Sequence, residues 1–183
     1  LGTTLDDAAG ECFDKSAKIL GLPFPGGPTV EKTAKNCRNP IAALKKFPLP
    51  TPMKGRQGCD FSFSGLKTAV RTCAQHQLKQ DEIADLCYSF QHSMSEVMAD
   101  RCKNAIQFFL SHYKAETPTL VVAGGVSANL AIRSRLDDLT AKHNMRLYAP
   151  PLSLCGDNAA MIAWAGLEHL RLGYTSPLET KAR

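Results

Sequence analysis

Residues 119–129 constrain the fold more than any other stretch, because a short apolar run there meets two glycines and then a helical pattern. The run at 119–123 is rich in β-branched residues, which predicts a buried strand. Beyond Gly124 and Gly125, apolar residues recur at helical spacing, at Ile132, Leu136 and Leu139. A strand, a glycine turn and a helix in this order bring backbone close to a ligand at the carboxyl end of a sheet. The turn lacks the glycine spacing of a dinucleotide-binding loop and the Gly-Lys of a P-loop, so taken alone it predicts only a tight turn.

The rest of the pattern predicts an α/β fold. Helices are also predicted at residues 6–20, 29–35, 66–77, 81–113 and 157–172, and short strands at 60–64 and 145–149. The pattern at 81–113 is long enough for two helices or for one helix with a bend. Residues 36–58 are rich in proline and basic side chains, which predicts a surface loop.

Composition limits the class of protein. The chain has 183 residues, of which 44% are apolar and 21% charged, as in ordinary globular proteins. A net charge of +5 allows an anionic partner such as nucleic acid without requiring one. Seven cysteines without a Cys-x-x-Cys pair are interpreted as reduced thiols of a cytoplasmic protein. No apolar run is long enough to predict a transmembrane helix, so no membrane association is expected.

Carboxylates near glycine-rich loops are the first candidates for a functional site. Asp157 follows a predicted strand and opens a predicted helix, where it could ligate a metal ion or simply cap the helix. Asp14 lies inside the helix predicted at 6–20, where an exposed charge is the simpler interpretation. Gly27 could let backbone approach a phosphate or ribose, or could serve a turn alone. Glu31 could accept ribose hydroxyls, or be an ordinary glutamate of a first helical turn.

Other reactive side chains give weaker signals. Ser62, Ser64 and Lys67 lie close together in the sequence, but no Gly-x-Ser-x-Gly elbow surrounds them, so a serine hydrolase is weakly supported. The five histidines show no His-x-x-x-His or His-Glu-x-x-His spacing. Metal chemistry that uses this chain alone is therefore poorly supported. Asp6 and Asp7 are predicted to stabilise the positive end of their own helix.

Four motifs, taken in order, resemble those of one protein family. The first combines the helix at 6–15 with the Pro-Gly-Gly-Pro loop that ends at Pro28. The others are Asp60-Phe-Ser-Phe-Ser-Gly-Leu-Lys-Thr68, Ala123-Gly-Gly-Val-Ser-Ala-Asn129 and Asp157-Asn-Ala-Ala-Met-Ile-Ala163. They are similar to those of the tRNA threonylcarbamoyladenosine transferases of the TsaD type, formerly called O-sialoglycoprotein endopeptidases or glycoproteases. The residues within these motifs, and the lengths of the loops between them, are typical of the bacterial members of the family.

The resemblance implies a fold and a reaction. The fold is the actin-like ATPase (ASKHA) superfold, with two RNase H-like lobes and a nucleotide site in the cleft between them. The lobe present here would be an RNase H-like lobe with inserted helices. The reaction is an acyl transfer: the threonylcarbamoyl group moves from threonylcarbamoyl-adenylate to the exocyclic amine of the adenosine beside the anticodon of tRNA.

The resemblance also assigns residues. Contacts to threonylcarbamoyl-adenylate or ATP are implied for Asp14, Gly27, Glu31, Gly124, Gly125 and Asn129. Two of these glycines, Gly124 and Gly125, would line the adenosine, and Glu31 would contact the ribose. Asp157 would be one ligand of a divalent ion, iron or zinc, that polarises the acyl group. Gly156 stands before it, where the family often has Thr or Ser, so a hydroxyl is lost there.

The family's His-x-x-x-His pair, which provides the other metal ligands, is absent from these residues. We therefore expect the chain to be the C-terminal portion of a protein roughly twice as long, inactive by itself. Residues 1–35 would join the missing N-terminal lobe, 36–58 would form the basic loop, and 59–183 would form the second RNase H-like lobe with its C-terminal helix.

The resemblance implies three partners: tRNA, a smaller actin-like paralogue and an ATPase subunit of the bacterial modification complex. The basic segment could touch tRNA phosphates through Lys45, Lys46, Lys54 and Arg56, although solvated loop charges are the simpler interpretation. Three alternatives stay open at this stage. They are a non-catalytic actin-like paralogue that acts as an assembly partner, a metallopeptidase as in the older family label, and a sugar-kinase-like ATPase.

Overall fold

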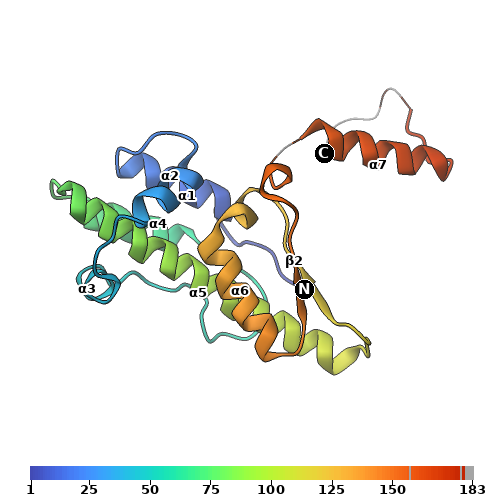
Figure 1. The fold of residues 1–183 in the computed structure, drawn as a ribbon, viewed down its shortest axis with the longest axis horizontal. Coiled ribbons are helices and arrows are strands. Elements are labelled where there is room, and N and C mark those ends of the chain that lie inside the picture. Colours follow the sequence, from blue (N-terminus) through green and yellow to red (C-terminus); the bar gives the residue numbers. More distant parts are fainter. Residues whose placement is uncertain (157, 178, 180–183) are drawn as a thin grey trace.

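A computed structural model describes residues 1–156, 158–177 and 179 of the chain. The helices are α1 (Ala9–Ile19), α2 (Gly26–Ala34), α3 (Pro40–Lys46), α4 (Ser64–Cys73), α5 (Gln80–His112), α6 (Leu130–Lys142) and α7 (Ala159–Arg171). The strands are β1 (Thr119–Val121) and β2 (Arg146–Tyr148), and short 3-10 turns form η1 (Gly125–Ala128) and η2 (Leu152–Leu154). Figure 1 shows most helices gathered around α5, with α7 standing apart from them. The α/β expectation holds in this coarse form, with helices dominant and a small parallel sheet.

The central element is α5, a single helix of 33 residues. Its sequence has neither glycine nor proline to interrupt it, so the alternative of two helices is wrong. Leu86, Phe90, Met94 and Val97 are all buried along its length. Helices α2, α3 and α6 pack against it, and α1 reaches it through Phe13, whose ring meets that of Phe90 edge-on at 5.1 Å. The core of the protein is the apolar surface of this one helix and its neighbours.

The sheet consists of two parallel strands joined through α6. Leu120 pairs with Leu147, and both are partly buried against the core. Val121 and Tyr148 point the other way and are 68% and 64% exposed. Within the part of the chain described, the prediction of a buried strand is right for the face that carries Leu120 and wrong for the opposite face, because only one face of this small sheet is covered by α6 and the core.

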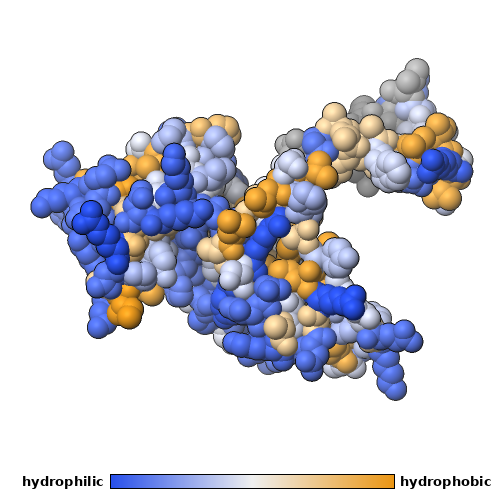
Figure 2. Space-filling model, in the orientation of Figure 1, coloured by the Kyte–Doolittle hydropathy of each residue, from blue (hydrophilic) through white to orange (hydrophobic). Residues whose placement is uncertain are grey.

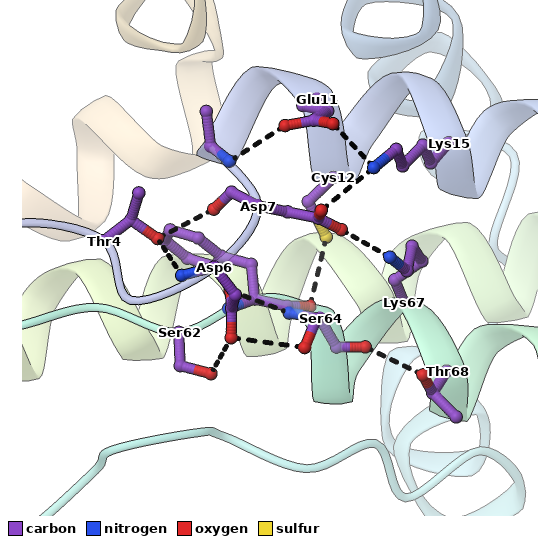
Figure 3. Close-up of polar contacts among 12 residues, drawn as sticks. Thr4, Asp6, Asp7, Glu11, Cys12, Lys15, Ser62, Ser64, Lys67 and Thr68 are labelled. Atoms are coloured by element: carbon purple, nitrogen blue, oxygen red, sulfur yellow. Dashed lines mark hydrogen bonds and ion pairs between the residues drawn. The ribbon is translucent and has the colours of Figure 1, made fainter.

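The strand predicted at 60–64 is absent from the described structure, which has only an isolated bridge between Thr4 and Phe61 there. Helix α4 begins at Ser64 because a distant carboxylate caps it. The carboxylate of Asp6 accepts hydrogen bonds from the Phe63 amide at 2.7 Å and the Ser64 amide at 3.1 Å (Figure 3). The prediction that Asp6 stabilises the positive end of its own helix is wrong. That helix begins only at Ala9, and Asp6 stabilises the positive end of α4 instead.

Asp7 joins the same network through its two carboxylate oxygens (Figure 3). It pairs with Lys67 of α4 at 2.6 Å and with Lys15 of α1 at 2.9 Å. The hydroxyls of Ser62 and Ser64 donate to Asp6 instead of meeting Lys67. These three side chains are thus bound to carboxylates that hold α1 and α4 together, and the described contacts give no support to a serine nucleophile.

Residues 36–58 are not a loop throughout. Helix α3 lies within them, capped by Asn39, and its Ala43 is buried together with Phe47. The following turn is held to α5 by the buried side chain of Arg101, which donates to the carbonyl oxygen of Arg56 at 2.8 Å and to that of Gly58 at 3.1 Å. This segment is therefore packed on α5, because its few apolar side chains and its carbonyl oxygens have partners there.

No residue of helix α7 is buried in the described structure, and Trp164 and Ile162 are 63% and 67% exposed. Figure 2 shows apolar side chains on this helix, which projects from the rest of the molecule. Asn158 caps the helix by accepting from the Met161 amide at 2.8 Å. Among the residues described, no helix combines the length and apolarity needed to cross a membrane.

One ion-pair network predicts how stability depends on pH. The Arg135 side chain, 2.5 Å from Glu96, and next Lys54 hold the pKa of Glu96 down at about 2, against the opposing effect of burial. Because the folded-state pKa lies below the unfolded one, this stabilisation is present above about pH 4.5 and is lost as the pH falls toward 2. We expect Glu96→Gln to lower the free energy of unfolding at pH 7 by about 1 kcal/mol, with much of that difference gone near pH 2.5.

Urea unfolding at both pH values measures this difference. Glu116→Gln is the matched control, because Glu116 is exposed and has no ion pair among the described residues. An equal loss of stability at both pH values in Glu96→Gln would contradict the assigned role.

Candidate functional site

A cavity of about 470 Å³ lies between the α1–α2 pair and the turn that follows β1. Its size falls in the range of small-molecule sites, roughly 300–1,000 Å³. The lining comes from four separated segments of the chain and consists of Gly10, Phe13, Asp14, Pro25, Gly27, Pro28, Glu31, Gly125, Val126, Ala128, Asn129 and Gly156.

The structure brings most of the sequence-predicted site residues to this cavity. Five of them line it directly: Asp14, Gly27, Glu31, Gly125 and Asn129. Gly124 directly precedes Gly125 and has a φ of 88°, in the region that favours glycine. Asp157, the expected metal ligand, lies outside the described residues, although its neighbour Gly156 lines the cavity. The roles that the resemblance gives these residues stay predictions.

One wall is built where α1 meets α2. The Oδ1 atom of Asp14 accepts a hydrogen bond from the Gly26 amide at 2.8 Å, so Asp14 caps α2 from a neighbouring helix. This bond explains why α2 begins at Gly26, earlier than the predicted start at residue 29. A Cβ atom on Gly26 would lie 2.6 Å from the Cα of Asp14 and 2.8 Å from the Cβ of Ala17, so the close approach requires glycine. The second oxygen of Asp14 has no partner among the described residues.

The opposite wall is built at the start of α6, where Asn129 has two hydrogen bonds. Its Oδ1 accepts from the Ile132 amide at 3.0 Å, which caps α6. Its Nδ2 donates to Oε1 of Gln91 on α5 at 2.8 Å, and both side chains are buried. The amide orientation of Asn129 is therefore determined by two partners, because exchanging its nitrogen and oxygen would break both bonds.

The two walls are joined directly. Oε1 of Glu31, on α2, accepts from the Leu130 amide at 3.0 Å, across 99 positions of sequence. The carboxylate thus lies at the positive end of α6, where a negative charge is favourable. Its other oxygen has no partner among the described residues and remains able to accept a hydrogen bond from a ligand. Glu31 is therefore both a clamp between the walls and a candidate contact.

Arg133 ties together the two loops that follow the strands. Its side chain donates to the carbonyl oxygen of Ser127 and, at 2.8 Å, to that of Pro150, and it lies 3.0 Å from the sulfur of Cys155. Gly125 and Gly156, which line the cavity, belong to these same two loops. Arg133 therefore determines how far apart the two loops stand.

Sequence reasoning missed Gln91 and Arg133, and each had a weak signal. Gln91 adjoins the apolar stripe of a long helix, where a buried amide needs a partner. Arg133 lies in the first turns of α6, near the positive end of the helix, where a cation is unfavourable unless tertiary contacts compensate. Neither signal says which groups are bound, because both partners come from distant segments.

The arrangement suits a bound small molecule with hydroxyl groups. Apolar walls at Phe13, Pro28 and Val126 can exclude water from a flat ring, and the free oxygens of Asp14 and Glu31 can accept hydroxyl hydrogens. The residues that the structure describes include no group of three His, Cys, Asp or Glu side chains able to hold a metal ion. The described lining therefore supplies groups for binding and orientation.

Comparisons with known proteins agree with the resemblance that the sequence motifs show. The sequence model of the family described as "tRNA N6-adenosine threonylcarbamoyltransferase" matches residues 1–164. Relatives with that name include one from Chelativorans sp. (strain BNC1), 55% identical over 174 residues, which are 93% of this chain and 47% of the relative. One from Rhodospirillum rubrum is 50% identical over 187 residues, 100% of this chain and 50% of the relative. One from Rhizobium etli (strain CIAT 652) is 52% identical over 176 residues, 94% and 47% respectively. The chain spans about half the length of the curated relatives it matches.

The close approach of α1 and α2 predicts different effects for two adjacent glycines. Gly26→Ala should lower the free energy of unfolding by roughly 1–3 kcal/mol, because the new methyl group meets backbone that cannot move freely. Gly27→Ala should change it by less than about 0.5 kcal/mol, because a Cβ there meets nothing within 4 Å. Urea unfolding of the two variants and the wild type measures this. Equal effects of the two substitutions would show that α1 and α2 do not approach as closely as described.

Proposed function

The chain belongs to the family of tRNA N6-adenosine threonylcarbamoyltransferases, and we propose on that premise that it forms one side of the active site of such an enzyme. The full enzyme would transfer the threonylcarbamoyl group from threonylcarbamoyl-adenylate to the amine of the adenosine beside the anticodon of tRNA. The observation that supports this most is the single cavity shared by Asp14, Gly27, Glu31, Gly125 and Asn129. A family resemblance carried by separated motifs gains weight when those motifs meet in space.

The polar groups of the cavity suit the adenylate part of that substrate. We propose that the free oxygens of Asp14 and Glu31 accept hydrogen bonds from ribose or threonyl hydroxyls. Gly27, in the first turn of α2, lets backbone approach the ligand where a side chain would intrude. The turn at Gly124 and Gly125 would do the same for the adenosine ring, and Asn129 would complete the contacts with its remaining amide hydrogen.

Binding of this kind contributes to catalysis by position. The amine of the tRNA adenosine would attack the carbamoyl carbon, the bond from that carbon to the phosphate oxygen would break, adenosine monophosphate would leave, and the amine would release one proton to solvent. A cavity whose walls are joined by Glu31, and whose two glycine-bearing loops are joined by Arg133, would hold the adenylate in one place while the amine approaches. The chain's own residues would thus fix the acyl donor and exclude water from it.

A divalent metal, iron or zinc, would polarise the acyl group in the full enzyme. The described residues do not form a ligand set for it. Asp157 stays the proposed ligand from this chain, and its position lies outside the described residues.

The fold and division of the chain are proposed on the same basis. A small parallel sheet with a glycine turn at its carboxyl end is compatible with an RNase H-like lobe of the actin-like superfold. Residues 1–35 would join this lobe to the remaining part of the enzyme, 36–58 would cover α5, and 59–183 would form the lobe itself. The exposed apolar side chains of α7 are consistent with burial against another lobe or against protein partners such as the actin-like paralogue and the ATPase subunit.

The proposed function implies a cytoplasmic location, where bacterial tRNA is modified. Fewer cations of the segment at 36–58 are free to bind tRNA than the sequence predicted. Lys46 is paired with Glu82 at 2.8 Å, and Lys54 with Glu96 at 2.9 Å. Lys45 is exposed and has no partner among the described residues, and the same is true of the Arg56 side chain. We expect these two cations, rather than all four, to contact phosphates.

Nucleotide binding tests the proposed site. Asp14→Asn keeps an oxygen that can accept from the Gly26 amide but replaces the free acceptor with a donor. We expect it to weaken ATP binding to the 183-residue chain by about 10- to 100-fold, the effect of losing a charged hydrogen bond. Calorimetric titration with ATP measures the affinity, and the thermal midpoint should hardly change. Asp137→Asn, on the exposed side of α6, is the control. Unchanged ATP affinity in Asp14→Asn would remove Asp14 from the site.

The salt dependence of tRNA binding tests the surface charges. Replacing Lys45 and Arg56 together by alanine should reduce the slope of log affinity against log salt by about 2, because two phosphate contacts are lost. A control pair, Lys114→Ala with Lys142→Ala, removes the same charge from other exposed positions. Filter-binding titrations at several salt concentrations measure the slopes. Equal slopes in the two double variants would mean that only net charge matters.

A further inference from the structure

A second hollow of about 270 Å³ adjoins the cavity on the outer side of the α1–α2 pair. Asp14 lines both spaces, and Gly26 in the hollow is followed by Gly27 in the cavity. Apart from Asp14, the family resemblance assigns no role to the residues that line this hollow. Its walls come from the end of α1 and from the loop at residues 20–25, which arches over the two helices in Figure 1.

The most prominent side chain of the hollow is Phe24, which is 83% exposed. A single exposed apolar residue is normal on a protein surface and by itself means little. Phe24, however, stands between Pro23 and Pro25, whose rings fix the backbone on each side. The loop is also anchored at both ends, by the Leu22 amide to the Ala17 carbonyl oxygen at 2.9 Å and by Gly26 to Asp14. The ring is therefore presented to solvent from a rigid support and loses little freedom when a partner covers it.

Two lysines and Asp14 are the charged side chains of the hollow. Lys15 and Lys18 both line the hollow, three positions apart on α1. Lys15 is occupied by Glu11 at 2.6 Å and Asp7 at 2.9 Å. Lys18 is exposed and has no partner among the described residues. An aromatic face with a free cation next to it matches the two parts of an unpaired nucleotide, a base and a phosphate.

We propose that this hollow binds an unpaired base of the RNA substrate, with Phe24 as the stacking surface and Lys18 as the phosphate contact. The proposal rests on the function proposed above, because the hollow would hold a loop base while the adjoining cavity holds the acyl donor. Since the two spaces share Asp14, a base stacked on Phe24 would deliver a neighbouring nucleotide of the same strand to the mouth of the cavity. Recognition of RNA loops by stacking splayed bases on aromatic side chains is the usual solution for single strands.

The test uses an RNA hairpin with the sequence of a tRNA anticodon arm, in which 2-aminopurine replaces a loop base next to the target adenosine. Stacking on Phe24 should quench the fluorescence of this base when the 183-residue chain binds the hairpin. Phe24→Ala should remove the quenching and weaken hairpin binding by roughly 5- to 100-fold, the effect of losing one stacked base. Phe24→Tyr should restore both, because it restores the ring.

Two further variants separate stacking from simple apolar contact and from charge. Phe24→Leu keeps apolar bulk without an aromatic face, and it should bind more weakly and leave the base unquenched. Lys18→Ala should weaken binding mostly at low salt and keep the quenching. Because Phe24 is exposed, the thermal midpoints of these variants should match that of the wild type.

ATP titration of the same variants distinguishes failure of this inference from failure of the proposed function. Unchanged ATP affinity together with lost quenching in Phe24→Ala supports the stacking role alone. If Phe24→Ala or Phe24→Leu binds and quenches like the wild type, or if the chain binds no hairpin, the inference is overturned, whatever the ATP result. If ATP does not bind but quenching still depends on Phe24, the hollow keeps its role and the adenylate site is wrong.

Discussion

Burial of the apolar face of α5 is the interaction on which the rest of the structure depends. Helices α2 and α6 both pack on it, so the distance between the two walls of the cavity depends on α5. Phe13 shows the connection most directly. Its ring lines the cavity and also meets Phe90 of α5 at 5.1 Å. Burial of an aromatic side chain of this kind contributes about 3–5 kcal/mol to the free energy of unfolding, which is more than any single polar contact around the site contributes.

Polar contacts then position the walls more finely, and most of them are helix caps supplied from elsewhere in the chain. Asp6 caps α4, Asp14 caps α2, and Glu31 binds the first amide of α6. Each cap of this type stabilises by about 1 kcal/mol, and a cap from another element also fixes the relative position of the two elements. Asp14 and Glu31 use one carboxylate oxygen in this way, and the other oxygen has no partner among the described residues. The structural role of these two side chains and the binding role proposed for them thus use different oxygens of the same carboxylate.

Several elements were predictable from local pattern, and several were not. The long apolar stripe at 81–113 predicts α5, and the strand, glycine turn and helix after residue 118 lie close to where they were expected. The segment at 60–64 reads as a strand because aromatic and polar residues alternate, yet Ser64 starts a helix. Its cap, Asp6, lies 58 positions away, so no local pattern could reveal it. Residues 36–58 read as a loop because charge and proline outweigh the short apolar cluster that buries Ala43 and Phe47.

By itself, the sequence predicted the family, the approximate order of elements and five of the residues that line the cavity, because motifs and periodicity are properties of neighbouring residues. Only the tertiary structure decided what those residues touch. It showed that Asn129 is oriented by Gln91, that Arg133 joins two loops, and that Lys46 and Lys54 are occupied by carboxylates. It also placed Phe24 on a rigid loop beside a free lysine. These facts depend on contacts between segments tens of residues apart, and such contacts are set by packing against α5 and have no local signature in the chain.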